Sequence, residues 1–298
     1  GITPDEAVMA LATSIHEEMP DLLDKEAGHE AGTFATDEGG MMTSLAVVLS
    51  QEMERFNKLV RVMRTSLVQL QKAIKGLVVM SGELEDMFNS MYSGKVPDMW
   101  HKSGYLCLKP LASWVPDFQR RIKFMEDWIK QGSMPSYWLP GFFFPQGFMT
   151  GVLQTHARKY LLPIDTLNFD FEMTRDEQGS DIASGPEDGV FIDGLFVDGG
   201  RWNRERQCLD ESEPGVMQSP LPVVWFKPAQ KQLENLFRPV KQDEYQTPLY
   251  KTSVRAGILS TTGQSTNFVL CVLLPIREDT NPDFWVQQGV ALLCMLDT

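Results

Sequence analysis

The stretch from Pro135 to Tyr160, PSYWLPGFFFPQGFMTGVLQTHARKY, divides the chain into a helical first part and a strand-rich second part. Its first half crowds aromatic side chains between prolines at positions 135, 140 and 145, and these prolines exclude a regular helix. From about Gly147 onward, apolar residues recur at helical spacing and basic residues gather near the end. We therefore predict a rigid aromatic segment that leads into a short amphipathic helix.

Aromatic side chains of this stretch are the candidate functional residues, and they are Trp138, Phe142, Phe143, Phe144 and Phe148. If buried, they would form a core plug that joins two subdomains, because aromatic residues dominate protein cores. If exposed, they would form a docking patch, because contiguous apolar surface marks interaction sites. We favour the core plug and keep the docking patch as the alternative.

Composition predicts a globular protein with a sizeable core. The chain has 298 residues, of which 43% are hydrophobic, and this suggests one large or two modest subdomains. No apolar run reaches the roughly 18 residues of a membrane span, and no signal peptide pattern opens the chain. The four cysteines are scattered without a CxxC pair, which predicts a reducing compartment.

The chain is strongly acidic, with a formal net charge of −13. Much of this charge lies in the first 40 residues, which hold ten acidic residues and one basic residue. Because an acidic chain repels polyanions, we expect no direct binding to nucleic acid, to an anionic membrane or to the acidic face of a microtubule.

Helical signals fill the first part of the chain. Thr3 and Glu6 form a capping box around Pro4, which predicts a helix that stops near Pro20. Residues 21–41 are predicted to form a mobile acidic loop, most simply a solvated linker. A heptad seam then predicts one long helix, or two in line, over about residues 43–80. The seam consists of Leu49, Met53, Phe56, Val60, Met63, Leu67, Leu70, Ile74 and Leu77.

We expect this long helix to lie across a core, because the chain is globular on both sides of it. Apolar residues off the seam, such as Leu59 and Val79, suit burial on more than one side. A short helix should follow. Residues 96–114 should then form an ordered crossing loop, and Pro116 should open a further helix that ends at Gly132.

After the aromatic stretch the apolar period changes to two. Residues 167–173 alternate clearly and predict a half-buried strand. Strands in series with Gly, Pro and Asp turns predict an antiparallel barrel or sandwich, whose closure would hide the strand edges. Gly194 inside its strand indicates a bulge or a close backbone approach, and Pro222 should open its strand. The further strands are predicted at 189–197, 222–227, 249–253, 257–261, 267–274 and 290–296.

Active-site patterns are scarce in this sequence. There is no GxxxxGK[ST] phosphate loop, and residues 260–266 resemble one only superficially, so we predict a hairpin connection there. Asp188, Asp193 and Asp198 recur every five residues on alternating faces, which does not suit a calcium loop. The four histidines lie apart in different elements.

Two basic sites have both a functional and a plainer interpretation. Arg201 could stack over Trp202 as a cation–π site, but ordinary surface packing is favoured. Lys251 and Arg255 could bind a carboxylate of a partner, but a solvated strand face is favoured. We therefore predict no catalytic, cofactor-binding or metal-binding residue and disfavour an autonomous enzyme, although catalytic groups converge in space rather than in sequence.

Several segments, in order, resemble the C-terminal region of dynein heavy chains, most closely the axonemal (ciliary and flagellar) ones. Besides the aromatic stretch they include QEMERFNKL, KAIKGLVVMSGELEDMFNSM, KPLASWVPDFQRRIKFMEDWI, PEDGVFIDGLFVDGGRW and PLYKTSVRAGILSTTGQSTNFVL. The first 40 residues resemble the family poorly. The final LCMLDT resembles the family's natural end, so a C-terminal piece of a much larger protein is expected.

The resemblance implies an α+β fold in which a helical part precedes an incomplete antiparallel β-barrel. We divide it into an acidic tail of the last AAA+ module (1–42), a helical subdomain (43–162) and a β-barrel subdomain (163–298). The family implies a non-catalytic domain, without a cofactor, that braces the AAA+ ring of an ATP-driven microtubule motor in the axoneme and tunes its output. Expected partners are that ring and possible further axonemal dynein subunits. The alternative is a protein-binding module that docks another axonemal component.

Overall fold

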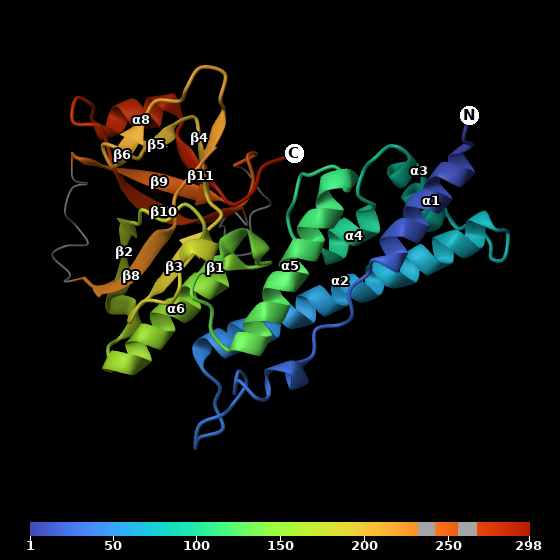
Figure 1. Ribbon diagram of the computed structural model, residues 1–298, viewed down its shortest axis with the longest axis horizontal. Helices are drawn as coiled ribbons and strands as arrows, with labels where there is room; N and C mark the ends of the chain where they lie inside the picture. The colour runs from blue at the N-terminus through green and yellow to red at the C-terminus, as the bar shows by residue number, and fades with distance from the viewer. Residues whose placement is uncertain (232–241, 256–266) are drawn as a thin grey trace.

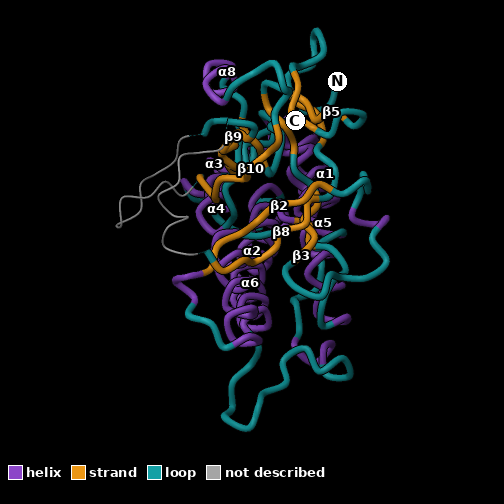
Figure 2. Tube along the Cα trace, turned by 90° about the vertical axis from the view of Figure 1, so that its left-hand side faces the viewer, coloured by secondary structure: helices purple, strands orange, loops and turns teal. Residues whose placement is uncertain are grey.

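The structure, a computed structural model, describes residues 1–231, 242–255 and 267–298 (Figure 1). Helices α1 to α5 gather on one side of the molecule and the sheets on the other. Helix α6 (Pro145–Tyr160) lies between the long helix α2 and the strands, as Figures 1 and 2 show. The predicted α+β class is therefore confirmed, with a helical part that precedes the strand-rich part.

The capping box at the start of the chain is confirmed. Thr3 Oγ1 accepts from the backbone N–H of Glu6 at 3.2 Å, and Glu6 Oε2 accepts from the N–H of Thr3 at 3.1 Å. These bonds satisfy free donors at the start of helix α1, which spans Pro4–Glu17. The helix buries Val8 and Ala12 against its neighbours.

The acidic segment after α1 packs against two helices, so its prediction as a solvated linker is wrong. It contains a 3-10 helix, η1 (Lys25–Gly28). The N–H of Leu23 donates to Asn57 Oδ1 at 2.8 Å, and Asn57 Nδ2 donates back to the Leu23 carbonyl at 2.9 Å. Thr33 Oγ1 donates to the carbonyl of Ile129 at 2.7 Å. The buried side chain of Leu23 fixes the acidic segment against the helices, and the composition of the segment did not predict this burial.

Helix α2 (Ser44–Ile74) is the predicted long helix, and its apolar seam is buried from Leu49 to Leu70. The helix ends six residues before the predicted end. Gly76 takes a φ of +78° there, a conformation that terminates helices at low cost in glycine. Leu77 and Val79, predicted to be buried, are instead 70% and 86% exposed.

Three further helices complete the helical part. Helix α3 (Gly82–Tyr92) is the expected short helix, and α4 (Asp98–Ser103) lies within the stretch predicted to be a loop. Helix α5 (Leu111–Gln131) begins five residues before Pro116, so the predicted start is wrong. Burial of Leu111 and Trp114 supports the extra turn, although Pro116 removes one hydrogen bond from it.

The strands form three sheets in the described residues, with orders β1-β3-β8-β2, β10-β9-β11-β4-β7 and β5-β6. The predicted purely antiparallel barrel is wrong: β1 runs parallel to β3, β11 runs parallel to β9, and no closed barrel is found among the described strands. The physical reason is that β1 and β11 join their sheets by long crossovers, which sequence alternation does not reveal. The bounds are β1 Tyr137–Trp138, β2 Leu167–Met173, β3 Val190–Asp193, β4 Phe196–Asp198, β5 Arg201–Asn203, β6 Cys208–Asp210, β7 Gln218–Pro220, β8 Val224–Gln230, β9 Glu244–Tyr250, β10 Phe268–Pro275 and β11 Ala291–Leu293.

Several strand predictions have clear outcomes. The strand at 167–173 is confirmed as β2, and the strand predicted at 189–197 is split into β3 and β4 at Gly194. Gly194 has a φ of +90°, and a Cβ there would lie 2.6 Å from Trp138 Cδ1, so the predicted close approach is confirmed. Pro222 lies two residues before β8. The strand predicted at 257–261 lies outside the described residues.

One hydrophobic core runs through both parts of the molecule. It includes Phe56 and Trp128 from the helices together with Phe226 and Leu292 from the sheets. The division at residues 42 and 162 therefore stays a prediction, because packing is continuous across both positions. Helix α8 (Pro282–Gln288) covers β9 in the strand-rich part. Within the described ranges, no helix combines the length and hydropathy needed to cross a membrane.

Candidate functional site

The aromatic segment, defined here as residues 137–148, builds the junction between helices and sheets. Tyr137 and Trp138 form strand β1, which pairs with Ile192 and Asp193 of β3. A 3-10 turn, η2 (Leu139–Gly141), follows, and α6 begins at Pro145. The same short segment thus supplies one strand to a sheet and opens the helix that packs on α2.

The five candidate aromatic residues do not share one environment. Trp138, Phe142 and Phe148 are buried, Phe143 is half-buried, and Phe144 is 44% exposed. The Phe142 ring lies 4.5 Å from the Phe148 ring, centroid to centroid, and both rings pack near Trp128 of α5. Whether any of the five docks a partner stays a prediction.

Phe143 is the residue at which the two parts of the molecule meet. Its ring packs edge-on against Phe56 of α2, with centroids 4.6 Å apart, and against Tyr105 at 5.4 Å. Its backbone N–H donates to Glu52 Oε2 of α2 at 2.7 Å. Its carbonyl accepts from Lys251 Nζ, just after β9, at 3.4 Å. We call Glu52, Phe143 and Lys251 the Phe143 bridge.

Glu52 is the acidic end of this bridge and is only 1% exposed. Its second oxygen, Oε1, accepts from the N–H of Phe144 at 3.0 Å and lies 3.6 Å from Arg55 Nη1. Burial raises the pKa of Glu52, while the two N–H groups and Arg55 partly oppose that shift. Glu52 thus satisfies two backbone donors that would otherwise be buried without an acceptor.

Lys251 is the basic end of the bridge. Its ammonium group is half-buried, and burial lowers the pKa of Lys251, so the predicted solvated strand face is wrong for this residue. The Lys251 backbone N–H donates to the carbonyl of Asn267 at 2.8 Å, which holds the residue beside β10. The bridge therefore runs from α2, through the backbone N–H and carbonyl of Phe143, to Lys251, which directly follows β9 of the five-stranded sheet.

A second buried charge, Arg121 of α5, lies close to the bridge. Its Nε donates to Asp117 Oδ2 at 2.8 Å, its guanidinium lies 3.5 Å from the centroid of the Tyr105 ring, and its Nη2 lies 3.8 Å from the sulfur of Met295. Met295 follows β11, so Arg121 also links a helix to the strand-rich part. In the described part of the chain, Arg121 Nη1 and Tyr105 Oη are buried without a hydrogen-bond partner.

Sequence reasoning missed Glu52 and Arg121, although helical spacing carries a signal for both. Glu52 lies three residues after Leu49 and four before Phe56, so it shares their buried face. Arg121 lies three residues after Phe118 on the buried face of α5. A charged residue on the apolar face of a helix indicates that its side chain is buried and paired with a polar partner. The sequence around Lys251 carries no comparable signal.

The other polar candidates form separate ion pairs elsewhere in the described part of the chain. Asp188 accepts from Lys159 Nζ at 2.8 Å, and Asp198 accepts from Arg255 Nη2 at 2.7 Å. Arg201 pairs with Asp210 at 3.1 Å. Across residues 1–231, 242–255 and 267–298, no group of three His, Cys, Asp or Glu residues could hold a metal ion. The loop at 260–266 lies outside these ranges.

Fold and site together define a mixed α+β domain in which hydrogen bonds from Glu52 and Lys251 to the backbone of Phe143 join the helices to the strand-rich part. The protein belongs to the family of C-terminal domains of dynein heavy chains, whose model matches residues 1–294. This finding confirms the family resemblance of the sequence.

Similar proteins are axonemal dynein heavy chains. The chain is 44% identical to dynein axonemal heavy chain 6 of Homo sapiens over 315 residues, which cover 99% of this chain and 7% of that protein. It is 44% identical to heavy chain 3 of Homo sapiens over 297 residues, covering 100% of this chain and 7% of that protein. It is 49% identical to dynein axonemal heavy chain 12 of Homo sapiens over 254 residues, which cover 85% of this chain and 8% of that protein. The chain thus spans less than a tenth of the length of these relatives.

Proposed function

We propose that this chain is the C-terminal domain of an axonemal dynein heavy chain and that it braces the AAA+ ring of an ATP-driven motor. It works in the axoneme of a cilium or flagellum, in contact with the ring of its own heavy chain. ATP is hydrolysed elsewhere in that heavy chain, and this domain adjusts the motor's output without breaking bonds itself. The family match and the axonemal relatives support the assignment.

The observation that carries the bracing role is the Phe143 bridge. A brace must transmit a displacement without yielding at its own joints. Here the backbone N–H of Phe143 is bonded to Glu52 of the 31-residue helix α2, and its carbonyl is bonded to Lys251 of the strand-rich part. Because packed cores are bistable rather than continuously deformable, such a joint moves as one piece. Coupling between ring modules of about 1–3 kcal/mol is the typical scale for an effect of this kind.

Removal of residues 163–298 is a coarse test, because the shared core means that the helical part would lose its own packing. Lys251→Met in the full heavy chain is sharper, since it removes the ammonium group and keeps the bulk of the side chain. We expect it to change ATPase rate or microtubule gliding velocity by at least about fivefold, the lower end of the range of allosteric couplings. The matched control is Lys227→Met, whose ammonium group contacts Glu172 at the surface at 3.0 Å. Unchanged ATPase rate and velocity in Lys251→Met would contradict the bracing role.

A second candidate function, docking of another axonemal component, is favoured by one observation. The exposed ring of Phe144 lies beside Arg55, whose guanidinium is 5.6 Å from its centroid. Phe144→Ala tests this role without disturbing the core, whereas Phe142→Ala would remove a buried ring. Capture of axonemal proteins that is lost in Phe144→Ala would support docking, and equal capture would contradict it.

A further inference from the structure

A crevice with a volume of about 560 Å³ lies between helix α5 and the strand-rich part of the molecule. Segments that are far apart in the sequence line it, among them α5, the aromatic segment, the 3-10 turn η4 (Gly179–Asp181), the turn between β3 and β4, and the residues that follow β11. In Figure 1, α5 lies next to the paired strands β1 and β3. Clefts of this size at the boundary between two parts of a protein are favoured positions for small ligands.

Two donors that have no acceptor within the described residues lie at this crevice. The indole of Trp138 lines it, and the guanidinium of Arg120 on α5 lies 4.0 Å from the centroid of the Trp138 ring. Trp138 is only 9% exposed, and its Nε1 lies against Gly194, where a Cβ would be 2.7 Å from this nitrogen. In the described part of the chain, Arg120 forms no ion pair and Trp138 Nε1 donates no hydrogen bond. Their N–H groups are therefore available to an oxyanion, which a guanidinium binds through two parallel hydrogen bonds.

Asp193 supplies a negative charge beside these donors. It lines the same crevice and is the register partner of Trp138 in the parallel pairing of β1 with β3. Its Oδ2 lies close to the turn η4, because a Cβ at Gly179 would be 2.7 Å from this oxygen. Asp193 forms no ion pair with any residue that the structure describes. An ammonium group bound in the crevice would therefore give this carboxylate a charged partner.

Apolar side chains also line the crevice, and they come from Pro140, Phe196, Met295 and Leu296. An apolar group of a ligand would leave water when it packs against them, and this transfer is favourable. The crevice thus combines donors for an oxyanion, an acceptor for an ammonium group and an apolar wall. An apolar amino acid carries the three groups that complement these features.

We infer that the crevice between α5 and the strand-rich part binds a small zwitterion with an apolar group, which is the chemistry of an apolar amino acid. The ligand's carboxylate accepts from Arg120 and from Trp138 Nε1, its ammonium group donates to Asp193, and its apolar group packs against Leu296. The inference goes beyond the bracing role and does not depend on it, because none of the three residues of the Phe143 bridge lines the crevice.

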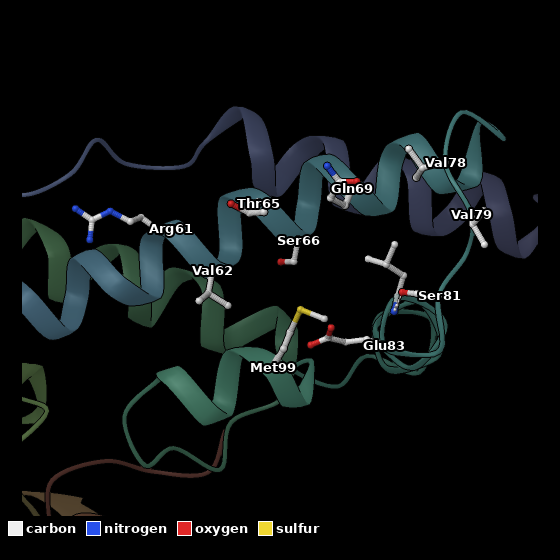
Figure 3. A pocket seen from close by; sticks show the side chains of 11 residues that line it. Arg61, Val62, Thr65, Ser66, Gln69, Val78, Val79, Ser81, Glu83 and Met99 are labelled. Atoms are coloured by element: carbon white, nitrogen blue, oxygen red, sulfur yellow. Dashed lines mark hydrogen bonds between the residues drawn. The ribbon is translucent and has the colours of Figure 1, made fainter.

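Another cavity of similar volume provides a matched control. It measures about 600 Å³, lies between α2, α3 and α4, and is lined by Arg61 of α2. Figure 3 shows the side chain of Arg61 directed away from the other labelled residues of this cavity. No aromatic ring is among the described residues that line it, so Arg61 has no indole beside it there. Arg61→Gln therefore removes an arginine from a cavity of the same size that lacks the proposed ligand groups.

The test titrates L-leucine into the isotope-labelled chain while NMR spectroscopy follows the indole N–H signals of its seven tryptophans. We expect the assigned Trp138 signal to shift until it saturates. Arg120→Gln should weaken the affinity for leucine at least about tenfold, because a hydrogen bond to a charged group is lost. Arg120 is exposed, so this change leaves the core intact. Arg61→Gln should leave the affinity unchanged.

Two analogues of leucine separate the contributions of its charged groups. Isocaproate lacks the ammonium group and isoamylamine lacks the carboxylate, and we expect both to bind more weakly than leucine. Asp193→Asn should make the affinities for leucine and isocaproate equal, because it removes the charge that the ammonium group contacts. A Trp138 signal that does not shift with leucine would overturn the inference. Equal affinities of the wild-type chain for leucine and either analogue would do so as well, and so would equal weakening by Arg120→Gln and Arg61→Gln.

Discussion

The surroundings of helix α2 differ sharply between its middle, near Glu52, and the loop that follows its C-terminal end. Near Glu52, the helix is enclosed by the core, and even its carboxylate is buried and bonded to the backbone of Phe143 and Phe144. Beyond Ile74, the same heptad seam continues into Leu77, which is 70% exposed. A single hydrophobic pattern is therefore buried within the domain at one end and exposed at the other.

The largest expected effect is at the junction of helices and sheets, where Gly194 meets Trp138 of the aromatic segment. Gly194→Ala would place a Cβ 2.6 Å from Trp138 Cδ1 at a φ of +90°. Backbone strain and overpacking together should lower the free energy of unfolding by roughly 3–5 kcal/mol. Urea denaturation of the chain measures this loss. The matched control is Gly215→Ala, also at positive φ but with no atom within 4 Å of the added Cβ, and an equal loss in both variants would contradict the close approach.

The next effect concerns the bridge itself. Glu52→Gln keeps the shape of the side chain but replaces one acceptor oxygen with an NH₂ group, which faces a backbone N–H. We expect a loss of about 1–3 kcal/mol in the free energy of unfolding, because one buried donor loses its acceptor. Glu54→Gln, on the exposed face of the same helix, should stay within about 0.5 kcal/mol of wild type. Similar free energies of unfolding of the two variants in urea denaturation would contradict a stabilising role for the Glu52 hydrogen bonds.

A smaller effect is expected in the pH dependence of stability. Burial raises the pKa of Glu52 above its usual 4.5, so the folded state keeps a proton that the unfolded chain releases. Folding is therefore less favourable as pH rises above about 4.5 through the folded-state pKa. Glu52→Gln carries no such proton. The free energy of unfolding of wild type, measured relative to this variant at a series of pH values, should fall over that window, and parallel curves would contradict the raised pKa.

The smallest effect is expected at the free end of α2. Leu77→Ala should change the free energy of unfolding by no more than about 0.5 kcal/mol, because its side chain is already exposed. Leu70→Ala, one heptad earlier on the same seam and fully buried, should cost about 2–5 kcal/mol. Thermal or urea unfolding of the two variants compares the two ends directly. Equal losses would mean that the seam is buried throughout its length.

Periodicity predicted the elements whose packing repeats regularly. Three of these features could be predicted from the sequence because each is a local pattern. They are the seam from Leu49 to Leu70, the alternation in β2 and the capping box at Thr3. The short strands β5 to β7 were missed, since three residues carry no measurable period. Helix α8 was missed although Asn281 caps it and Pro282 opens it, a pair that also occurs in turns.

The sequence alone could not predict which distant segments pair with each other in the sheets. Nothing local in Tyr137 indicates that it pairs in parallel with Ile192, because the partner is chosen by the path of the whole chain. The candidate site was partly accessible: the aromatic segment stood out, whereas Lys251 could be placed only by the fold that brings it to Phe143. The burial of Glu52 could have been predicted from its helical spacing to Leu49 and Phe56.

The central claim is that helices and sheets form one body joined through Phe143. Amide hydrogen exchange of the protein under mildly denaturing conditions tests it most directly, by comparing the opening free energies of α2 and β9 in wild type and in Glu52→Gln. We predict equal opening free energies in the two elements, and an equal loss in both when Glu52, which lies on α2 alone, is changed. Exchange in β9 that stays at its wild-type level while α2 is destabilised would contradict the claim.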